Sequence, residues 1–180
     1  MTDGPFLKTE RFELWKPVSG DLQDLVRLLE GEDMTRFLGP ARPDPMSQFE
    51  RLLRNAGSWM LYGYGVFYVR CPGEPQIVAS CGVFRSWRGF GKGMDDVAEA
   101  GWIVRQDWWG RGVAGEIMRT VLPWFDETWG KQRVACMIED GNTASERLAD
   151  ALGFVRYDSH REETGERTVL NLYERLPGET

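Results

Sequence analysis

The spacing of apolar and polar side chains changes several times along the chain, and each change marks an expected element. Residues 11–16 alternate between polar and apolar side chains, which is typical of a strand, whereas residues 21–30 place leucine and valine at helical intervals. After a turn-rich passage with several prolines, Ser47 and Glu50 have the spacing of a capping box. The amino-terminal part therefore predicts one strand followed by two helices, the second over residues 47–55.

The middle of the chain has the pattern of a sheet. Residues 63–70 and 76–84 are rich in valine, isoleucine, tyrosine and phenylalanine, and the segment between them contains glycine and two prolines. That combination predicts an antiparallel hairpin. A long glycine-rich loop at residues 85–97 then precedes another predicted strand at residues 98–104.

The last third alternates between strands and helices. A helix is predicted over residues 112–129, with Pro123 expected to kink it or to start a new turn. A strand over residues 133–138, a helix over residues 142–152 and two strands within residues 154–174 follow.

Length and composition fit one globular domain. The chain has 180 residues, of which 42% are hydrophobic and 28% charged, so a single domain over residues 1–180 is expected. The order of elements predicts an α/β (α+β) fold. Its mixed, mostly antiparallel sheet has six to seven strands, one parallel pair near the middle, and helices on both faces.

Charge and reactive side chains exclude several classes of function. Lysine and arginine total 22 against 28 aspartates and glutamates, giving a net charge of −6, which argues against a nucleic-acid partner. The amino terminus lacks a basic start with an apolar run, and no segment approaches about 18 apolar residues, so a cytoplasmic protein without a membrane partner is expected. One histidine and three widely spaced cysteines predict no metal site and no disulfide framework.

The clearest local signal is the glycine turn after the strand that ends at Val104. Gly110, Gly112 and Gly115 open the next helix, where backbone N–H groups and the helix dipole favour phosphate. The same glycines match a dinucleotide fingerprint, but five residues separate Val104 from the first of them, and the acidic residue Glu139 lies further along than that fingerprint requires. The turn predicts a pyrophosphate site for another cofactor, with a dinucleotide-binding oxidoreductase as the less favoured alternative.

Three blocks of sequence stand in a characteristic order. They are LKTERFEL at residues 7–14, EAGWIV at 99–104 with WGRGVAGE at 109–116, and NTAS at 142–145 with LGF at 152–154. Together they resemble the GNAT superfamily of N-acetyltransferases, most closely its RimJ/RimL-like ribosomal-protein acetyltransferase branch. The resemblance implies a GNAT-like fold in which the two central parallel strands are splayed apart.

The resemblance also implies acetyl-CoA as co-substrate, no metal, and direct transfer of the acetyl group to an amine in a ternary complex. In this family the splayed strand binds the pantetheine arm as another strand would, a backbone N–H polarises the thioester carbonyl, and the glycine turn binds the pyrophosphate. The implied cofactor-binding residues are Trp102, Ile103, Val104, Trp109, Gly110, Arg111, Gly112, Val113, Ala114, Gly115, Asn142 and Ser145.

Three residues are candidates for the proton transfers, two of them leading and one weaker. Glu99 is the leading candidate for the base that deprotonates the amine, and a solvent-facing strand residue is the alternative interpretation. Many family members carry a tyrosine in the helix before Leu-Gly-Phe to protonate the departing thiolate, but residues 147–150 contain none. Ser145 is then the candidate acid, with ordinary helix first-turn chemistry as its alternative role, and Tyr157 is a weaker candidate.

The acceptor is predicted only as a class, a small-molecule or peptide amine. An acidic chain suits a cationic amine, and the loop at residues 86–96 has the glycines, aromatics and carboxylates of a lid, although a solvated surface loop is slightly favoured. Trp59, Trp87, Trp108 and Trp109 are candidates for an acceptor slot or for the core. Because the tyrosine is missing, a non-catalytic acyl-CoA-binding or regulatory module is the second hypothesis.

Overall fold

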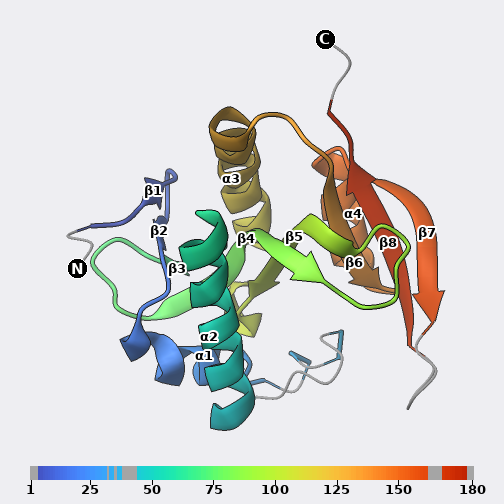
Figure 1. Cartoon of the computed structure of the whole chain (residues 1–180). Helices are drawn as coiled ribbons and strands as arrows, with labels where there is room; N and C mark the ends of the chain where they lie inside the picture. Colours follow the sequence, from blue (N-terminus) through green and yellow to red (C-terminus); the bar gives the residue numbers. More distant parts are fainter. Residues whose placement is uncertain (1–3, 32, 35, 38–43, 162–167, 178–180) are drawn as a thin grey trace.

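The computed structural model describes residues 4–31, 33–34, 36–37, 44–161 and 168–177, and these form one sheet with helices on both faces (Figure 1). The strands are β1 (Leu7–Lys8), β2 (Glu13–Trp15), β3 (Val66–Arg70), β4 (Ile77–Trp87), β5 (Asp95–Val104), β6 (Val134–Glu139), β7 (Val155–Arg161) and β8 (Val169–Arg175). In the described residues they pair in the order β1-β2-β3-β4-β5-β6-β8-β7. Only β5 and β6 pair in parallel; the other neighbouring strands are antiparallel. A dinucleotide fold would need several such parallel units.

The sheet has eight strands where the sequence predicted six to seven. The expected single strand at residues 11–16 is instead the second half of a short hairpin, in which Leu7 pairs with Leu14. A tight turn closes this hairpin, because the N–H of Thr9 donates to the carbonyl of Phe12 at 2.9 Å. Alternation alone could not reveal a turn that needs neither glycine nor proline.

Two helical layers cover the sheet (Figure 1). The α-helices are α1 (Leu22–Leu28), α2 (Pro45–Tyr62), α3 (Val113–Trp129) and α4 (Thr143–Ala151), with short 3-10 helices η1 (Ser19–Asp21) and η2 (Gln106–Trp108). Helices α1 and α2 pack on one face around Leu25, Leu52 and Tyr68, and α3 and α4 pack on the other around Ile117, Phe125 and Ala149. The crossover from β5 to β6 runs through α3.

Helix α2 begins before the predicted capping box. Its N-cap is Asp44, whose carboxylate accepts hydrogen bonds from the Ser47 N–H at 3.0 Å and the Ser47 hydroxyl at 2.7 Å. Pro45 occupies the first helical position, where its missing N–H costs nothing. The helix then runs past Asn55, the predicted end, to Tyr62. An Asp-Pro pair was therefore the better start signal.

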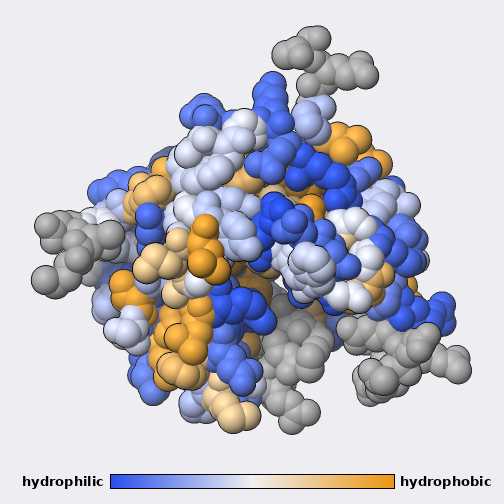
Figure 2. Space-filling model, viewed as in Figure 1, coloured by the Kyte–Doolittle hydropathy of each residue, from blue (hydrophilic) through white to orange (hydrophobic). Residues whose placement is uncertain are grey.

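The outer face of α2 carries an apolar stripe. Met46, Phe49, Leu53 and Met60 are all exposed and share that face, and Figure 2 shows the stripe running along the helix. The inner face is more polar than a core helix usually is, because Gln48 and Asn55 are buried there. In α3, Pro123 lies inside the helix without ending it, on an exposed position, so the predicted new turn does not occur.

Candidate active site

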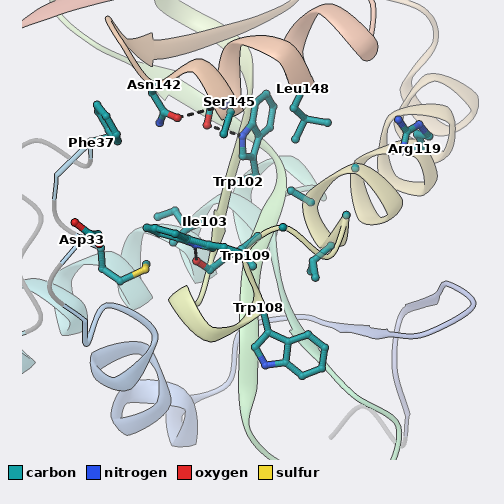
Figure 3. Close-up of a pocket in the computed structure, with 18 residues that line it drawn as sticks. Asp33, Phe37, Trp102, Ile103, Trp108, Trp109, Arg119, Asn142, Ser145 and Leu148 are labelled. Atoms are coloured by element: carbon teal, nitrogen blue, oxygen red, sulfur yellow. Dashed lines mark hydrogen bonds between the residues drawn. The ribbon is translucent and has the colours of Figure 1, made fainter.

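A pocket of about 490 Å³ opens where β5 and β6 separate (Figure 3). Its lining comes from the end of β5, the turn before α3, the first turns of α3 and α4, and residues 33, 34 and 37. These segments are far apart in the sequence, so the splay of one strand pair brings them together.

The separation of β5 from β6 follows from their register. The two strands pair only over residues 98–100, whereas β5 stays paired with β4 to its end at Val104. Since the Arg105 N–H donates to the Val78 carbonyl, the antiparallel pattern turns the peptide groups of Ile103 toward β4. The peptide groups of Trp102 and Val104 therefore face the gap, and Ile103 lines the pocket with its side chain.

The side chain of Trp109 crosses this gap. Its indole Nε1 donates to the Val104 carbonyl at 2.7 Å, and the ring extends across the middle of the pocket (Figure 3). The side chain is 46% exposed. The carbonyl of Val104 thus already has a partner, which leaves the Val104 N–H and the peptide groups of Trp102 for a ligand.

The glycine turn has the geometry of an anion cradle. Gly110 and Gly112 have φ of 72° and 69°, a left-handed conformation that favours glycine. The first backbone bond of α3 runs from the Glu116 N–H to the Gly112 carbonyl, so the N–H groups of residues 113–115 have no partner within the helix. A Cβ at Gly115 would stand 2.9 Å from Nη1 of Arg119. These residues fit a pyrophosphate on three grounds: free N–H groups, bare backbone and the positive end of the helix dipole.

A second cationic side chain, which sequence reasoning did not single out, lies at this cradle. The guanidinium of Arg111 lies 5.2 Å from the centre of the Trp108 ring and is outside the described lining. Arg119, one helical turn after Gly115, lines the pocket instead. Its spacing of four residues from Gly115 was a signal that sequence reasoning could have used.

A clasp from the amino-terminal hairpin holds the start of α3. The Glu116 carboxylate accepts hydrogen bonds from the Thr9 hydroxyl at 2.6 Å, the Arg11 N–H at 3.0 Å and the Arg11 Nε at 2.6 Å. Burial alone would raise the pKa of Glu116, but these hydrogen bonds outweigh it and leave the pKa below its ordinary value. The carboxylate stays ionised and the helix start is fixed against β1 and β2.

The first turn of α4 presents two polar side chains to the pocket. Asn142 is the N-cap, and its Oδ1 accepts from the Ser145 N–H at 3.2 Å, which leaves the amide NH₂ group to donate. The Ser145 hydroxyl oxygen accepts from the Trp102 indole at 3.2 Å, so its own hydrogen points elsewhere (Figure 3). Leu148 lines the pocket in the stretch where a tyrosine was sought. Tyr157 donates to the Lys92 carbonyl at 2.7 Å and lies outside the described lining.

Glu99 is buried but not free. Its side chain is on the α1–α2 face of β5, only 3% exposed, and accepts two hydrogen bonds from the guanidinium of Arg88, one of them from Nε at 2.9 Å. Burial alone would lower the pKa of Arg88, but the bond to Glu99 outweighs it and raises that pKa. A proton could reach Glu99 only with a change in this ion pair.

The loop that was considered as a lid covers another part of the sheet. It spans residues 88–94 and crosses in front of β6 and β8 in Figure 1. Phe90 stacks on His160 with ring centres 3.9 Å apart, and Arg133 donates to the Gly93 carbonyl at 2.7 Å. None of its residues belongs to the described lining of the pocket.

The tryptophans divide between core, surface and pocket. Trp59 is buried, Trp87 is 73% exposed, and Trp108 and Trp109 line the pocket. No pattern in the sequence pointed to another group of lining residues, Asp33, Met34 and Phe37, which follow α1. Asp33 accepts a hydrogen bond from the Gln106 side chain at 3.4 Å.

The described residues contain neither a cluster of metal ligands nor a membrane-spanning helix. No group of three histidine, cysteine, aspartate or glutamate side chains is arranged to hold a metal ion. Of the helices described, none is both long enough and apolar enough to cross a membrane.

Comparison with known proteins identifies the domain type. The sequence matches the acetyltransferase (GNAT) domain over residues 11–155. A protein from Bordetella pertussis assigned to the GNAT acetyltransferase family is 30% identical, with a TM-score of 0.83 over 94% of this chain and 98% of that one.

More distant structures share the fold. The ribosomal-protein-S5-alanine acetyltransferase from Vibrio fischeri has a TM-score of 0.76 at 15% identity, over 96% of this chain and 97% of that one. A microcin C7 self-immunity acetyltransferase in complex with acetyl-CoA and AMP has a TM-score of 0.73 at 12% identity, over 98% of this chain and 97% of that one.

Proposed function

Because the chain belongs to the acetyltransferase (GNAT) family, we propose that it transfers the acetyl group of acetyl-CoA to a primary amine by direct attack within a ternary complex. The observation that carries the proposal is the gap beside β5, where the peptide groups of Trp102 lie between the N–H cradle of residues 113–115 and the α1–α2 face. A thioester arm added along this edge would extend from the cradle to the place where an amine can enter.

The residues of the gap have distinct roles in this proposal. The N–H groups of residues 113–115 and the guanidinium of Arg119 hold the pyrophosphate, and Asn142 donates its amide hydrogens to the arm. When bound, acetyl-CoA supplies an activated acetyl group. A backbone N–H at Trp102 or Val104 stabilises the negative charge that develops on the carbonyl oxygen.

Two side chains move the protons. Ser145 donates its hydroxyl hydrogen to the departing thiolate, supported by the Trp102 indole, which already occupies a lone pair of that oxygen. Glu99 accepts the amine proton through water, because its carboxylate lies outside the described lining of the pocket. Its ion pair with Arg88 must loosen in that step.

Direct attack is supported by the state of the cysteines. Cys81 and Cys136 are buried, and burial raises the pKa of Cys81 to about 12 and that of Cys136 further still. Neither thiol can form the thiolate that a covalent acetyl-enzyme needs near neutral pH.

The finer assignment is to the RimJ/RimL-like branch, whose acceptors include peptide amines. It is supported by the sequence blocks at residues 7–14 and 142–145 and is compatible with the shared fold of the Vibrio fischeri enzyme. The general acid is the point at which this chain departs from the family pattern, because Leu148 lines the pocket in the stretch without tyrosine.

The test is release of free thiol from acetyl-CoA with a panel of peptides, polyamines, amino acids and aminoglycosides. Initial rates at varied concentrations of both substrates should give intersecting lines, as a ternary complex requires, and parallel lines would contradict direct attack. If acetyl-CoA binds in calorimetry but no amine releases thiol, the chain is instead an acyl-CoA-binding module. The missing tyrosine favours that second candidate.

A further inference from the structure

One arginine beside the sheet lacks the carboxylate partner that several other arginines of the chain have. Arg70, Arg88 and Arg175 each pair with a carboxylate, those of Asp21, Glu99 and Asp126. Arg51 of α2 is half-buried, yet among the residues that the structure describes no carboxylate pairs with its guanidinium and no acceptor takes its N–H groups. An unpaired, partly buried charge is costly and calls for a compensating ligand.

The surroundings of Arg51 add further positive charge. Burial lowers the pKa of Arg51 to about 10, and the charges of Arg54 and Arg88 act in the same direction, while Tyr68 opposes them. The guanidinium is therefore still protonated near neutral pH. Arg51, Arg54 and Arg88 carry three positive charges, and the Glu99 carboxylate paired with Arg88 compensates one of them. The group therefore has a local excess of positive charge in a chain whose net charge is −6.

The fold places Arg51 above the row of residues that leads to the pocket. One helical turn further along α2, Asn55 donates to the Tyr68 hydroxyl at 3.1 Å. Tyr68 pairs with Ser80 across β3 and β4, and Ser80 pairs with Ile103 across β4 and β5. Neighbouring strands are about 4.8 Å apart, so this row spans roughly 10 Å. It ends at Ile103, which lines the pocket.

A second polar group in that row also lacks a partner. The Ser80 side chain is 3% exposed, and its hydroxyl has no hydrogen-bond partner among the described residues. Gly101, between Ile103 and Glu99 on the same face of β5, adds no side chain to this surface. An unpaired hydroxyl and an unpaired guanidinium thus lie on the α1–α2 face, opposite α3 and its cradle.

We propose that Arg51 binds an anionic group carried by the acceptor amine, namely a carboxylate or a phosphate. The inference rests on the proposed function and deepens it, because it replaces the cationic amine expected from net charge with an amine that bears its own negative group. Arg51 selects the acceptor and takes no part in the proton transfers.

The first experiment compares acceptors that differ in one charge. Thiol release is measured for alanine against alaninamide, O-phosphoethanolamine against ethanolamine, and the dipeptide Ala-Glu against Ala-Gln. Since the members of a pair also differ in amine pKa, the quantity compared is the anionic-to-neutral ratio of kcat/KM in the wild type and in Arg51→Gln. The pair of acceptors whose ratio changes most identifies the anionic group that Arg51 binds as an amino-acid carboxylate, a phosphate or an acidic peptide side chain.

Arg51→Gln is expected to lower that ratio at least tenfold and to leave the KM for acetyl-CoA within twofold, with Arg51→Lys in between. Arg156→Gln, an exposed position on β7, is the matched control and should change neither quantity. An equal loss for both members of every pair, or an unchanged ratio, overturns the proposal.

The second experiment does not depend on turnover. The thermal midpoint of the wild type should rise with N-acetylalanine but not with N-acetylalaninamide, and Arg51→Gln should abolish the difference. Removing an uncompensated charge should itself raise the midpoint of the variant by about 2–4 °C. If no amine releases thiol, the proposed function fails, but a midpoint shift that depends on Arg51 still supports the anion site. Without that shift, and with a lower midpoint for the variant, Arg51 is a structural residue and the inference is wrong.

Discussion

The two faces of β5 offer a ligand different kinds of group. On the α3–α4 side these groups are mostly main-chain N–H groups, those of residues 113–115 and of Trp102, which glycines and the separation of β5 from β6 leave exposed. On the α1–α2 side the proposed group is a side chain, the guanidinium of Arg51, which comes from a segment far away in the sequence. A cofactor common to a whole family suits the first arrangement, and an acceptor that differs between members suits the second.

The difference leads to an experimental separation. Changes on the α3–α4 side should alter acetyl-CoA binding or the chemical step equally for every acceptor. Changes on the α1–α2 side should alter which acceptor is used and leave the affinity for acetyl-CoA as it was.

The largest effect on catalysis is expected at Ser145, the residue proposed to protonate the departing thiolate. Ser145→Ala removes the proposed proton donor and should lower kcat about 100-fold or more for all acceptors, with the KM for acetyl-CoA nearly unchanged. Steady-state kinetics measures this. Thr143→Ala, an exposed neighbour in the same helical turn, is the control for a purely structural role of that turn. Equal kinetics for the two variants would remove Ser145 from the mechanism.

The cradle should respond almost as strongly. Gly112→Val places a side chain at a φ of 69° and displaces the N–H groups, so the affinity for acetyl-CoA should fall about 100-fold, or about 2.7 kcal/mol, in calorimetry. Gly73→Val imposes similar strain at a φ of 78° in the β3–β4 turn. It should lose stability without losing affinity. A parallel loss of affinity in both variants would mean that strain, not the cradle, decides binding.

The clasp gives a smaller effect with a pH signature. Glu116→Gln should lower the free energy of unfolding by about 2 kcal/mol at pH 7 and acetyl-CoA affinity about tenfold, because hydrogen bonds to a charged acceptor are weakened. Since the pKa of Glu116 is lowered in the folded state, its contribution is fully present above the unfolded value of about 4.3 and is lost as the pH falls through the folded value. Denaturation at several pH values should therefore bring wild type and variant together in acid. Glu127→Gln, exposed near the end of α3, should stay at wild-type stability throughout.

A still smaller change is expected at the tryptophan across the gap. Trp109→Phe keeps an aromatic ring but removes the indole N–H, which frees the Val104 carbonyl for the ligand. One such hydrogen bond is worth about 0.5–1.5 kcal/mol net, so acetyl-CoA affinity should rise about threefold. Trp87→Phe on the surface is the calorimetric control. Weaker binding by Trp109→Phe would show that the indole N–H serves the ligand and not the strand.

The smallest effect should come from the outer face of α2. Leu53→Gln replaces an exposed apolar side chain and should change stability by less than about 0.5 kcal/mol, with unaltered acceptor preference. Chemical denaturation and the alanine to alaninamide ratio measure this. A changed ratio would mean that helix position, and not the Arg51 side chain, governs selection.

The glycine turn could be located from the sequence, whereas the packing on the α1–α2 side could not, for a physical reason. Glycines at 110, 112 and 115 and the cap at Asn142 act through their own backbone, so contiguous residues carry the signal. The partner of Glu99, the isolation of Arg51 and the lining by Phe37 depend on how separate elements pack. Periodicity holds no information about that packing.

The order of the elements in the fold could be predicted from the sequence, but some of their boundaries could not. Strand and helix order followed from hydrophobic spacing, and a GNAT-like sheet with one parallel pair was confirmed. The hairpin around Thr9 and the early start of α2 at Pro45 were missed, because each depends on a local hydrogen bond that the apolar pattern does not record.

The clasp on Glu116 has a consequence during synthesis. Thr9 and Arg11 leave the ribosome more than 100 residues before the carboxylate that they hold. At a translation rate of about 5–20 residues per second, Glu116 is synthesised roughly 5–20 s after the hairpin. The cradle is thus completed late, and a nascent chain cleaved ahead of Phe12 would still form the remaining strands but with the opening turn of α3 untethered.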